Sequence, residues 1–194
     1  MPKLVVTGVR FSYCNLTTPR VPQGGGEPKY SCTILLPKTQ TEMMQQIRKA
    51  VEEAVADGVK TKWNGVRPPI LNIPIHDGDG VRPSDGMPFG DECKGHWVFS
   101  ASSKDAPQIV DKHVMPILNP SDTYSGMYGN VSVNFYPYMH SGKKGIGCGL
   151  NNVMKTADGD ALAGRSSASS DFAGFAEQGD FAFGGIDPIT GMKL

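Results

Sequence analysis

The residues best suited to binding chemistry lie in the stretch 124–153, which reads YSGMYGNVSVNFYPYMHSGKKGIGCGLNNV. Within it, Tyr136 and Tyr138 alternate with the apolar residues of a predicted strand, so both rings should point away from the buried face. Lys143 and Lys144 follow in the predicted turn. Aromatic rings stack on planar groups and lysines neutralise phosphates, which are the two contacts that a single-stranded nucleic acid requires. The hairpin therefore predicts a nucleic-acid-binding surface.

Further rings and cations are candidates for the same surface, each with a plainer alternative. The additional aromatic candidates are Tyr124, Tyr128, Tyr13, Tyr30 and Trp97, and the additional phosphate-binding candidates are Lys29, Arg20, Lys104 and Arg10. Base contact and packing within a turn are equally open for Tyr124 and Tyr128. Trp97 shares its parity with Phe99 and Ala101, which favours a core position. Single lysines usually serve only solubility.

No common catalytic or cofactor motif is present in the sequence. The glycines near Lys143 do not have the spacing of a phosphate-binding loop, and GIGCG lacks the spacing of a dinucleotide-binding turn. The four histidines have no carboxylate or cysteine at a recognisable motif spacing. We therefore expect neither an enzyme nor a cofactor, and an active site assembled from distant loops is the alternative.

The cysteines and acidic turns give no metal-binding pattern. The cysteines are Cys14, Cys32, Cys93 and Cys148. They lie singly, so we expect free thiols, and Cys93 with His96 is an isolated C-x-x-H. Asp77-Gly-Asp79-Gly begins like a calcium loop, but Pro88 stands where the closing glutamate belongs. Ordinary turn chemistry is the expectation there.

The elements that must position the candidate residues are mostly strands. Alternation of apolar and polar residues predicts strands over Lys3–Tyr13, Lys29–Leu36, Gly95–Ser102 and Asn130–His140. A return strand after the turn carries Ile146, Cys148 and Leu150 on one face and glycines on the other. Such a set describes a mostly β fold, a small Greek-key barrel or sandwich.

One amphipathic helix interrupts the strands. A capping box at Thr39 and Glu42 should open it, and Gly58 should end it. Its predicted buried face consists of Met44, Ile47, Val51 and Val55. The spacing of these residues fits one side of a helix, which would cover a barrel end or a sheet face.

Long loop insertions complete the body of the chain. The loop Asn15–Pro28 contains three consecutive glycines and should be mobile. Between Lys60 and Lys94 the only predicted element is a short strand over Ile70–Ile75. A second candidate basic cluster lies beside Trp63 and consists of Lys60, Lys62 and Arg67.

The charge is unevenly distributed although the formal net charge is zero. Residues 156–194 contain six acids and two bases, so residues 1–155 carry the compensating positive charge. We expect a binding domain over 1–155 and a flexible acidic and aromatic tail over 156–194. No apolar stretch is long enough to span a membrane and the N-terminus does not read as a signal peptide, so we expect a soluble protein inside the cell.

Several segments together resemble a family of bacteriophage single-stranded DNA-binding proteins. They read FSYCNLTTPR, GGGEPKYSCTILLPK, VFSASSK, SDTYSGMYG, NFYPY and KGIGCGLNNVMK, and the resemblance covers about residues 3–156. It implies an OB-fold barrel, sequence-independent binding of single-stranded DNA during phage replication and recombination in the cytoplasm of a bacterial host, and an acidic tail that contacts partner proteins. The tail of this chain departs from that pattern because it ends in Gly-Met-Lys-Leu instead of a run of acids.

The tail phenylalanines are the remaining candidate residues. They are Phe172, Phe175, Phe181 and Phe183. Interleaved with acids, they could imitate alternating bases and phosphates and compete for the same groove, or they could be unstructured filler. The hypothesis for the whole chain is a protein that coats and protects single-stranded DNA. An enzyme and a structural phage protein, such as a tail or capsid component, are the alternatives.

Overall fold

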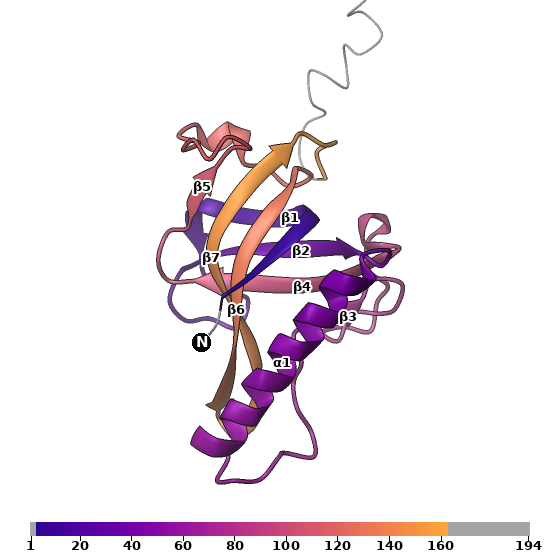
Figure 1. Ribbon diagram of the computed structural model, residues 1–194, viewed down its shortest axis with the longest axis vertical. Coiled ribbons are helices and arrows are strands. Elements are labelled where there is room, and N and C mark those ends of the chain that lie inside the picture. Colours follow the sequence, from indigo (N-terminus) through magenta and orange to yellow (C-terminus); the bar gives the residue numbers. More distant parts are fainter. Residues whose placement is uncertain (1–2, 163–194) are drawn as a thin grey trace, which may run out of the picture. The chain divides into compact units, whose positions relative to one another are not determined.

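Five strands close into a barrel in the computed structural model, which describes residues 3–162 (Figure 1). The barrel strands are β1 (Leu4–Arg20), β2 (Lys29–Pro37), β4 (His96–Ser103), β6 (Tyr128–His140) and β7 (Lys143–Ala157). β1 pairs antiparallel with β2 and β6, β2 pairs with β4, and β6 pairs with β7. A parallel bridge between Ser102 and Gly149 joins β4 to β7 and closes the barrel. This connectivity is that of an OB-type Greek-key barrel, so the expected mostly β fold is confirmed.

Short elements extend the barrel at both edges of the sheet. β3 (His76–Asp77) pairs with β4, and β5 (Gln108–Val110) pairs in parallel with β7. Two short 3-10 turns, Asp91–Cys93 and Pro120–Asp122, lie in the connections. The interior is filled by alternate residues of the strands, among them Val6, Phe11, Ile34, Phe99, Val131, Val133 and Leu150.

The first strand is longer than its alternation predicted. The sequence suggested an end at Tyr13 and a loop from Asn15, but β1 continues to Arg20, which pairs with Lys29. The ladder is irregular between Ser12 and Asn15, where Tyr13 has a positive φ of 46°. A bulge of this kind shifts the side-chain parity, so the second half of the strand lost its period-2 signal.

The helix α1 (Thr41–Thr61) buries the predicted face, but both of its predicted ends were wrong. Gln40 occupies the N-cap position without a side-chain cap, and its amide donates to the carbonyl of Gly8 instead, at 2.9 Å. The helix passes through Gly58 and ends at Thr61. A β-carbon on Gly58 would lie 2.7 Å from Cβ of Pro137 and 2.8 Å from the Trp63 ring. Gly58 is therefore needed for close packing and does not stop the helix.

The insertion between α1 and β4 connects the hairpin β6–β7 to the edge of the sheet. The predicted strand over Ile70–Ile75 was wrong apart from one bridge, because only Asn72 pairs, with Gly145. The chain then reaches β3, where His76 pairs with Val98. The turn chemistry expected at Asp77 is confirmed, since its carboxylate accepts the backbone N–H of Asp79 at 2.9 Å.

The last described residues belong to the folded body. β7 continues to Ala157, and the backbone N–H of Leu162 donates to the carbonyl of Ser125 at 2.9 Å. The packed part of the chain therefore extends beyond the domain boundary at Lys155 that the composition suggested. No helix within residues 3–162 has the length and apolar character needed to cross a membrane.

Candidate nucleic-acid interface

The outer face of the β6–β7 hairpin presents two tyrosine rings on a floor of glycines. Val131, Val133 and Phe135 are buried, whereas Tyr136 and Tyr138 are half-buried on the opposite face, so the predicted alternation is confirmed. Tyr136 pairs with Gly147 and Tyr138 with Gly145 across the two strands.

The glycines allow the rings to lie close to the sheet. A β-carbon on Gly147 would lie 2.4 Å from Cζ of Tyr136, and one on Gly145 would lie 2.7 Å from the Tyr138 hydroxyl. The Tyr136 ring therefore covers the bare backbone of Gly147, and the Tyr138 hydroxyl lies over Gly145. Burial raises the pKa of the Tyr136 hydroxyl, so the ring stays neutral at physiological pH.

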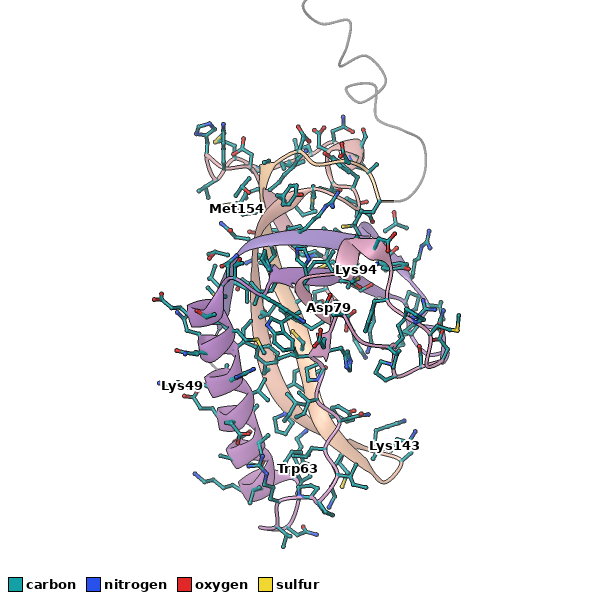
Figure 2. All side chains as sticks on the ribbon, turned by 90° about the vertical axis from the view of Figure 1, so that its right-hand side faces the viewer. Lys49, Trp63, Asp79, Lys94, Lys143 and Met154 are labelled. Atoms are coloured by element: carbon teal, nitrogen blue, oxygen red, sulfur yellow. The ribbon has the colours of Figure 1, made fainter. Side chains whose placement is uncertain are left out.

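The turn of the hairpin carries the two lysines that the sequence singled out. Ser141 and Gly142 have φ values of 49° and 77°, the left-handed pair typical of a tight two-residue turn. Lys143 is exposed at the tip, as Figure 2 shows, and Lys144 is half-buried beside it. Neither lysine forms an ion pair with any residue in the range 3–162. A hollow of about 570 Å³ next to the tip is lined by both lysines and the segment 66–72.

The hairpin face continues onto the outer faces of the neighbouring strands. Gly149 lies between Asn134 of β6 and Ser102 of β4. On the next pair of strands, the hydroxyls of Thr33 and Ser100 lie 3.0 Å apart and hydrogen bond to each other. Three strands of the barrel thus share one polar outer surface with the tyrosines.

A loop that the sequence left unassigned covers part of this surface. Residues 78–93, which we call the roof loop, stand over the outer faces of β1, β2 and β4 and partly cover an open cavity of about 610 Å³. Its floor includes Ser12, Thr33 and Ser100, and its walls include His76 and Phe89. The His76 and Phe89 rings stack with centroids 6.5 Å apart and planes 28° from parallel. Burial lowers the pKa of His76, which keeps its ring neutral near pH 7.

Apart from Tyr13, sequence reasoning missed the residues of this cavity. The hydroxyl row could have been found, because Thr33 and Ser100 occupy the outward parity of strands that were predicted correctly. His76 and Phe89 gave no such signal, since the paths of β3 and of the roof loop depend on distant contacts.

Several other predicted site residues gather where β1 meets β2. Tyr13 is 69% exposed at the mouth of the cavity, and it also lines a smaller hollow of about 240 Å³ with Arg20. Lys29 pairs with Arg20 across the strands. Tyr30 pairs with Ser103 near this end, and Lys104 forms an ion pair with Glu27. Of these positions, Tyr13 lines the roofed cavity, and the smaller hollow shares Ser12, Tyr13 and Glu92 with it.

Three predicted contact residues instead hold the end of β7. The Arg10 guanidinium donates to the carbonyls of Gly126, at 3.1 Å, and Asp160, at 2.7 Å, and it lies 5.3 Å from the centre of the Tyr128 ring. The Tyr124 hydroxyl donates to Asp158 at 2.8 Å. Burial and the neighbouring carboxylate raise the pKa of that hydroxyl. Packing within the fold accounts for Tyr124 and Arg10 without a ligand.

The two tryptophans lie away from the tyrosine face. Trp97 is partly buried against the core, as its parity favoured, with the cations of Lys38 and Arg48 5.0 Å and 5.9 Å from its ring centre. Trp63 is only 1% exposed and its indole N–H donates to the carbonyl of Tyr138 at 3.3 Å. It therefore supports the hairpin from behind and does not belong to an exposed basic cluster. Arg67, the proposed neighbour in that cluster, pairs with Glu52 at 3.0 Å.

The predicted tail residues Phe172, Phe175, Phe181 and Phe183 lie outside the described residues.

Comparison with known proteins places these features in one family. The family model described as "Enterobacter phage Enc34, ssDNA-binding protein" matches residues 2–182. Protein p50 of Acyrthosiphon pisum secondary endosymbiont phage 1 is 30% identical over 177 residues, which cover 86% of this chain and 90% of that protein.

Solved structures with the same fold come from two phages. The single-stranded DNA-binding protein from bacteriophage Enc34 in complex with ssDNA is similar with a TM-score of 0.70 and 26% identity, over 83% of this chain and 89% of that one. The single-stranded DNA-binding protein gp2.5 of bacteriophage T7 shares the fold, with a TM-score of 0.55 and 16% identity over 93% of this chain and 97% of that one. The resemblance expected from the sequence is confirmed, and this chain belongs to the family of the Enterobacter phage Enc34 ssDNA-binding protein.

Proposed function

We propose that this protein binds single-stranded DNA without sequence preference and coats it during phage DNA replication and recombination. The observation that carries the proposal is the pair Tyr136 and Tyr138, which lie opposite glycines of β7 next to the lysines of the hairpin turn. Rings stack on every base, and lysines bind phosphates whatever the sequence, so this combination favours the polymer over any particular base.

Similarity to a solved member of the family supports the same proposal. A relative that shares this barrel has been solved in complex with ssDNA. In an OB barrel, the outer face of the second and third strands and the adjoining loops are the usual ligand surface. Here those strands are β2 and β4, which carry the hydroxyl row and continue onto the tyrosine face. Arg20 and Lys29, at the β1–β2 end, and the lysines of the turn would contact phosphates at the two ends of this path.

The tail completes the proposal. Its acids and phenylalanines are suited to contact replication and recombination proteins in the cytoplasm of the bacterial host. The acids of the tail would also compete with the phosphates of DNA for the cations of the binding surface.

A fluorescence-anisotropy titration of oligo-dT against a duplex of equal length, at several salt concentrations, tests the main claim. The wild-type protein should bind oligo-dT more tightly than the duplex. Tyr136→Ala/Tyr138→Ala should weaken binding to oligo-dT by the loss of about 1–3 kcal/mol per stacked base.

Two controls keep the result interpretable. The double variant must retain the wild-type thermal transition, because the rings also cover Gly145 and Gly147. A matched Tyr128→Ala variant changes a ring at the far end of β6 and should leave the affinity for oligo-dT nearly unchanged. Equal affinity of the wild type for single strand and duplex would rule out the proposed function, and failure to bind oligo-dT at low salt would favour a structural phage protein.

A further inference from the structure

The roof loop partly covers a cavity that is separate from the hairpin tyrosines. This space, about 610 Å³, lies between a floor of hydroxyls and a wall that includes the His76 and Phe89 rings. Hydroxyl groups donate and accept hydrogen bonds, so Ser12, Thr33 and Ser100 can pair with the polar edge of any base. The cavity therefore has the chemistry of a nucleobase site with little base preference.

Several contacts hold the roof loop in place over this floor. At its start, Lys38 binds the carboxylates of Asp77 at 2.5 Å and Asp79 at 2.6 Å. Asp79 also accepts the backbone N–H of Gly95, at 3.0 Å. Because Asp77 lies in β3 and Gly95 directly precedes β4, these contacts tie the loop to the sheet.

The far end of the roof loop is held by apolar packing. Cys93 is buried with Leu35 and Val98, and Phe89 packs against the same group. A β-carbon on Gly78 would lie 2.0 Å from the carbonyl oxygen of Cys93, so the two ends of the loop touch. The ring of Phe89 is thus fixed from behind, while it forms part of the cavity wall in front.

We infer that the roofed cavity takes one unstacked nucleobase and thereby gives the protein its preference for single strands. This inference rests on the proposed function and names the device behind its selectivity. A base in a duplex is paired and stacked on both sides, and freeing it costs a few kcal/mol. A base in a single strand can turn under the roof at much lower cost. The lysines alone would not discriminate, because phosphates are common to both forms of DNA.

The test fills the cavity without removing a wall. Ser100 is an exposed residue on the floor, so Ser100→Phe places a ring inside the space and should spare the core. Affinity for oligo-dT should fall by about 5- to 150-fold, the equivalent of one lost base-stacking contact, whereas duplex affinity should stay within about twofold. Ser121→Phe introduces the same ring at an exposed site in the turn Pro120–Asp122 and should change neither affinity.

A second variant alters the wall of the same cavity. His76→Ala removes one ring of the stacked pair and should also reduce the preference for oligo-dT over duplex. Thermal unfolding of each variant reports whether the fold is intact. An intact Ser100→Phe protein with unchanged preference would overturn the roofed base site.

The outcomes separate this inference from the proposed function. Loss of oligo-dT binding in the tyrosine double variant, with wild-type selectivity in both cavity variants, would overturn the base site and leave the proposed function standing. Failure of the wild-type protein to bind oligo-dT would overturn both.

Discussion

At the scale of single residues, the binding surface depends on its glycines, which have no side chain, as much as on its aromatic residues. Gly147 lies in β7 with ordinary backbone angles, so alanine would fit its backbone. The obstacle is the ring of Tyr136, whose Cζ lies 2.4 Å from the position of the missing β-carbon. The glycine therefore sets the height and tilt of the ring above the sheet.

The variant Gly147→Ala separates ring orientation from ring presence. The added methyl group should push Tyr136 off the strand, lower the free energy of unfolding by about 1–3 kcal/mol and weaken oligo-dT binding several-fold. Chemical denaturation and anisotropy titration measure the two effects. Gly24→Ala is the matched control, since nothing lies within 4 Å of its β-carbon. Unchanged DNA affinity in Gly147→Ala would mean that the flat orientation of the ring is irrelevant to binding.

The hairpin lysines predict a specific change in salt dependence. Each phosphate contact on a single strand contributes about −0.7 to the slope of log affinity against log salt. Lys143→Ala/Lys144→Ala should therefore make the slope shallower by about 1.4. The control pair Lys49→Ala/Lys112→Ala removes the same charge from exposed positions in α1 and in the turn after β5, and it should leave the slope unchanged. A slope equal in the two double variants would remove these lysines from the site.

At the scale of elements, local patterns predicted the strands and the helix face, because the spacing of apolar residues within a short segment shows which side of a strand or helix is buried. The buried face of α1 and the outward parity of Tyr136 followed in this way. The bulge in β1, the passage of α1 through Gly58 and the course of the roof loop did not. Each depends on a partner far away in the sequence, such as Pro137 for Gly58 or Lys38 for Asp77.

The same distinction applies to the candidate site. A ring beside a basic turn is visible in the sequence, and so is an outward hydroxyl row. The sequence could not reveal that Arg10 and Tyr124 hydrogen bond to residues that follow β7. Nor could it reveal that Trp63 is buried behind the hairpin. The sequence gives the type of side chain at each position, whereas tertiary contacts decide whether that side chain is available to a ligand.

The contact between α1 and the hairpin gives a prediction with an unusual sign. Glycine to alanine within a helix normally stabilises a protein by up to about 1 kcal/mol. At Gly58 the new methyl group would meet Pro137 and Trp63, so Gly58→Ala should destabilise the protein by about 1–3 kcal/mol. Urea denaturation measures this change. Ala56→Gly, at an exposed position of the same helix, should cost no more than about 1 kcal/mol. A more stable Gly58→Ala protein would contradict this packing.

At the scale of the whole molecule, the point where the tail begins decides how a truncation should be designed. Residues 156–157 complete β7, and residues 158–162 contact Arg10, Tyr124 and Ser125. Lys155 pairs with Asp158 at 2.7 Å and lowers the pKa of that carboxyl. A cut directly after Lys155 therefore damages the body as well as removing the tail.

Two truncations should consequently behave differently. A chain that ends at Leu162 should keep the wild-type melting temperature and bind oligo-dT several-fold more tightly at low salt, because the tethered acids no longer compete. A chain that ends at Lys155 should melt at a lower temperature. Calorimetry and anisotropy measure both properties. Equal or weaker oligo-dT affinity of the chain ending at Leu162 would show that the tail does not compete with DNA.

The closure of the barrel carries a consequence for how binding can be observed. β4 and β7 meet at one bridge, Ser102 with Gly149, while the other barrel strands share long ladders. Amide hydrogens along this seam should exchange with deuterium sooner than those at the centre of β2, since few bonds must open to release them. A DNA strand bound across the outer faces of β4 and β7 would oppose the separation of these two strands. Slower deuterium exchange of these amides after DNA is added, measured for individual peptides by mass spectrometry, would therefore report DNA binding.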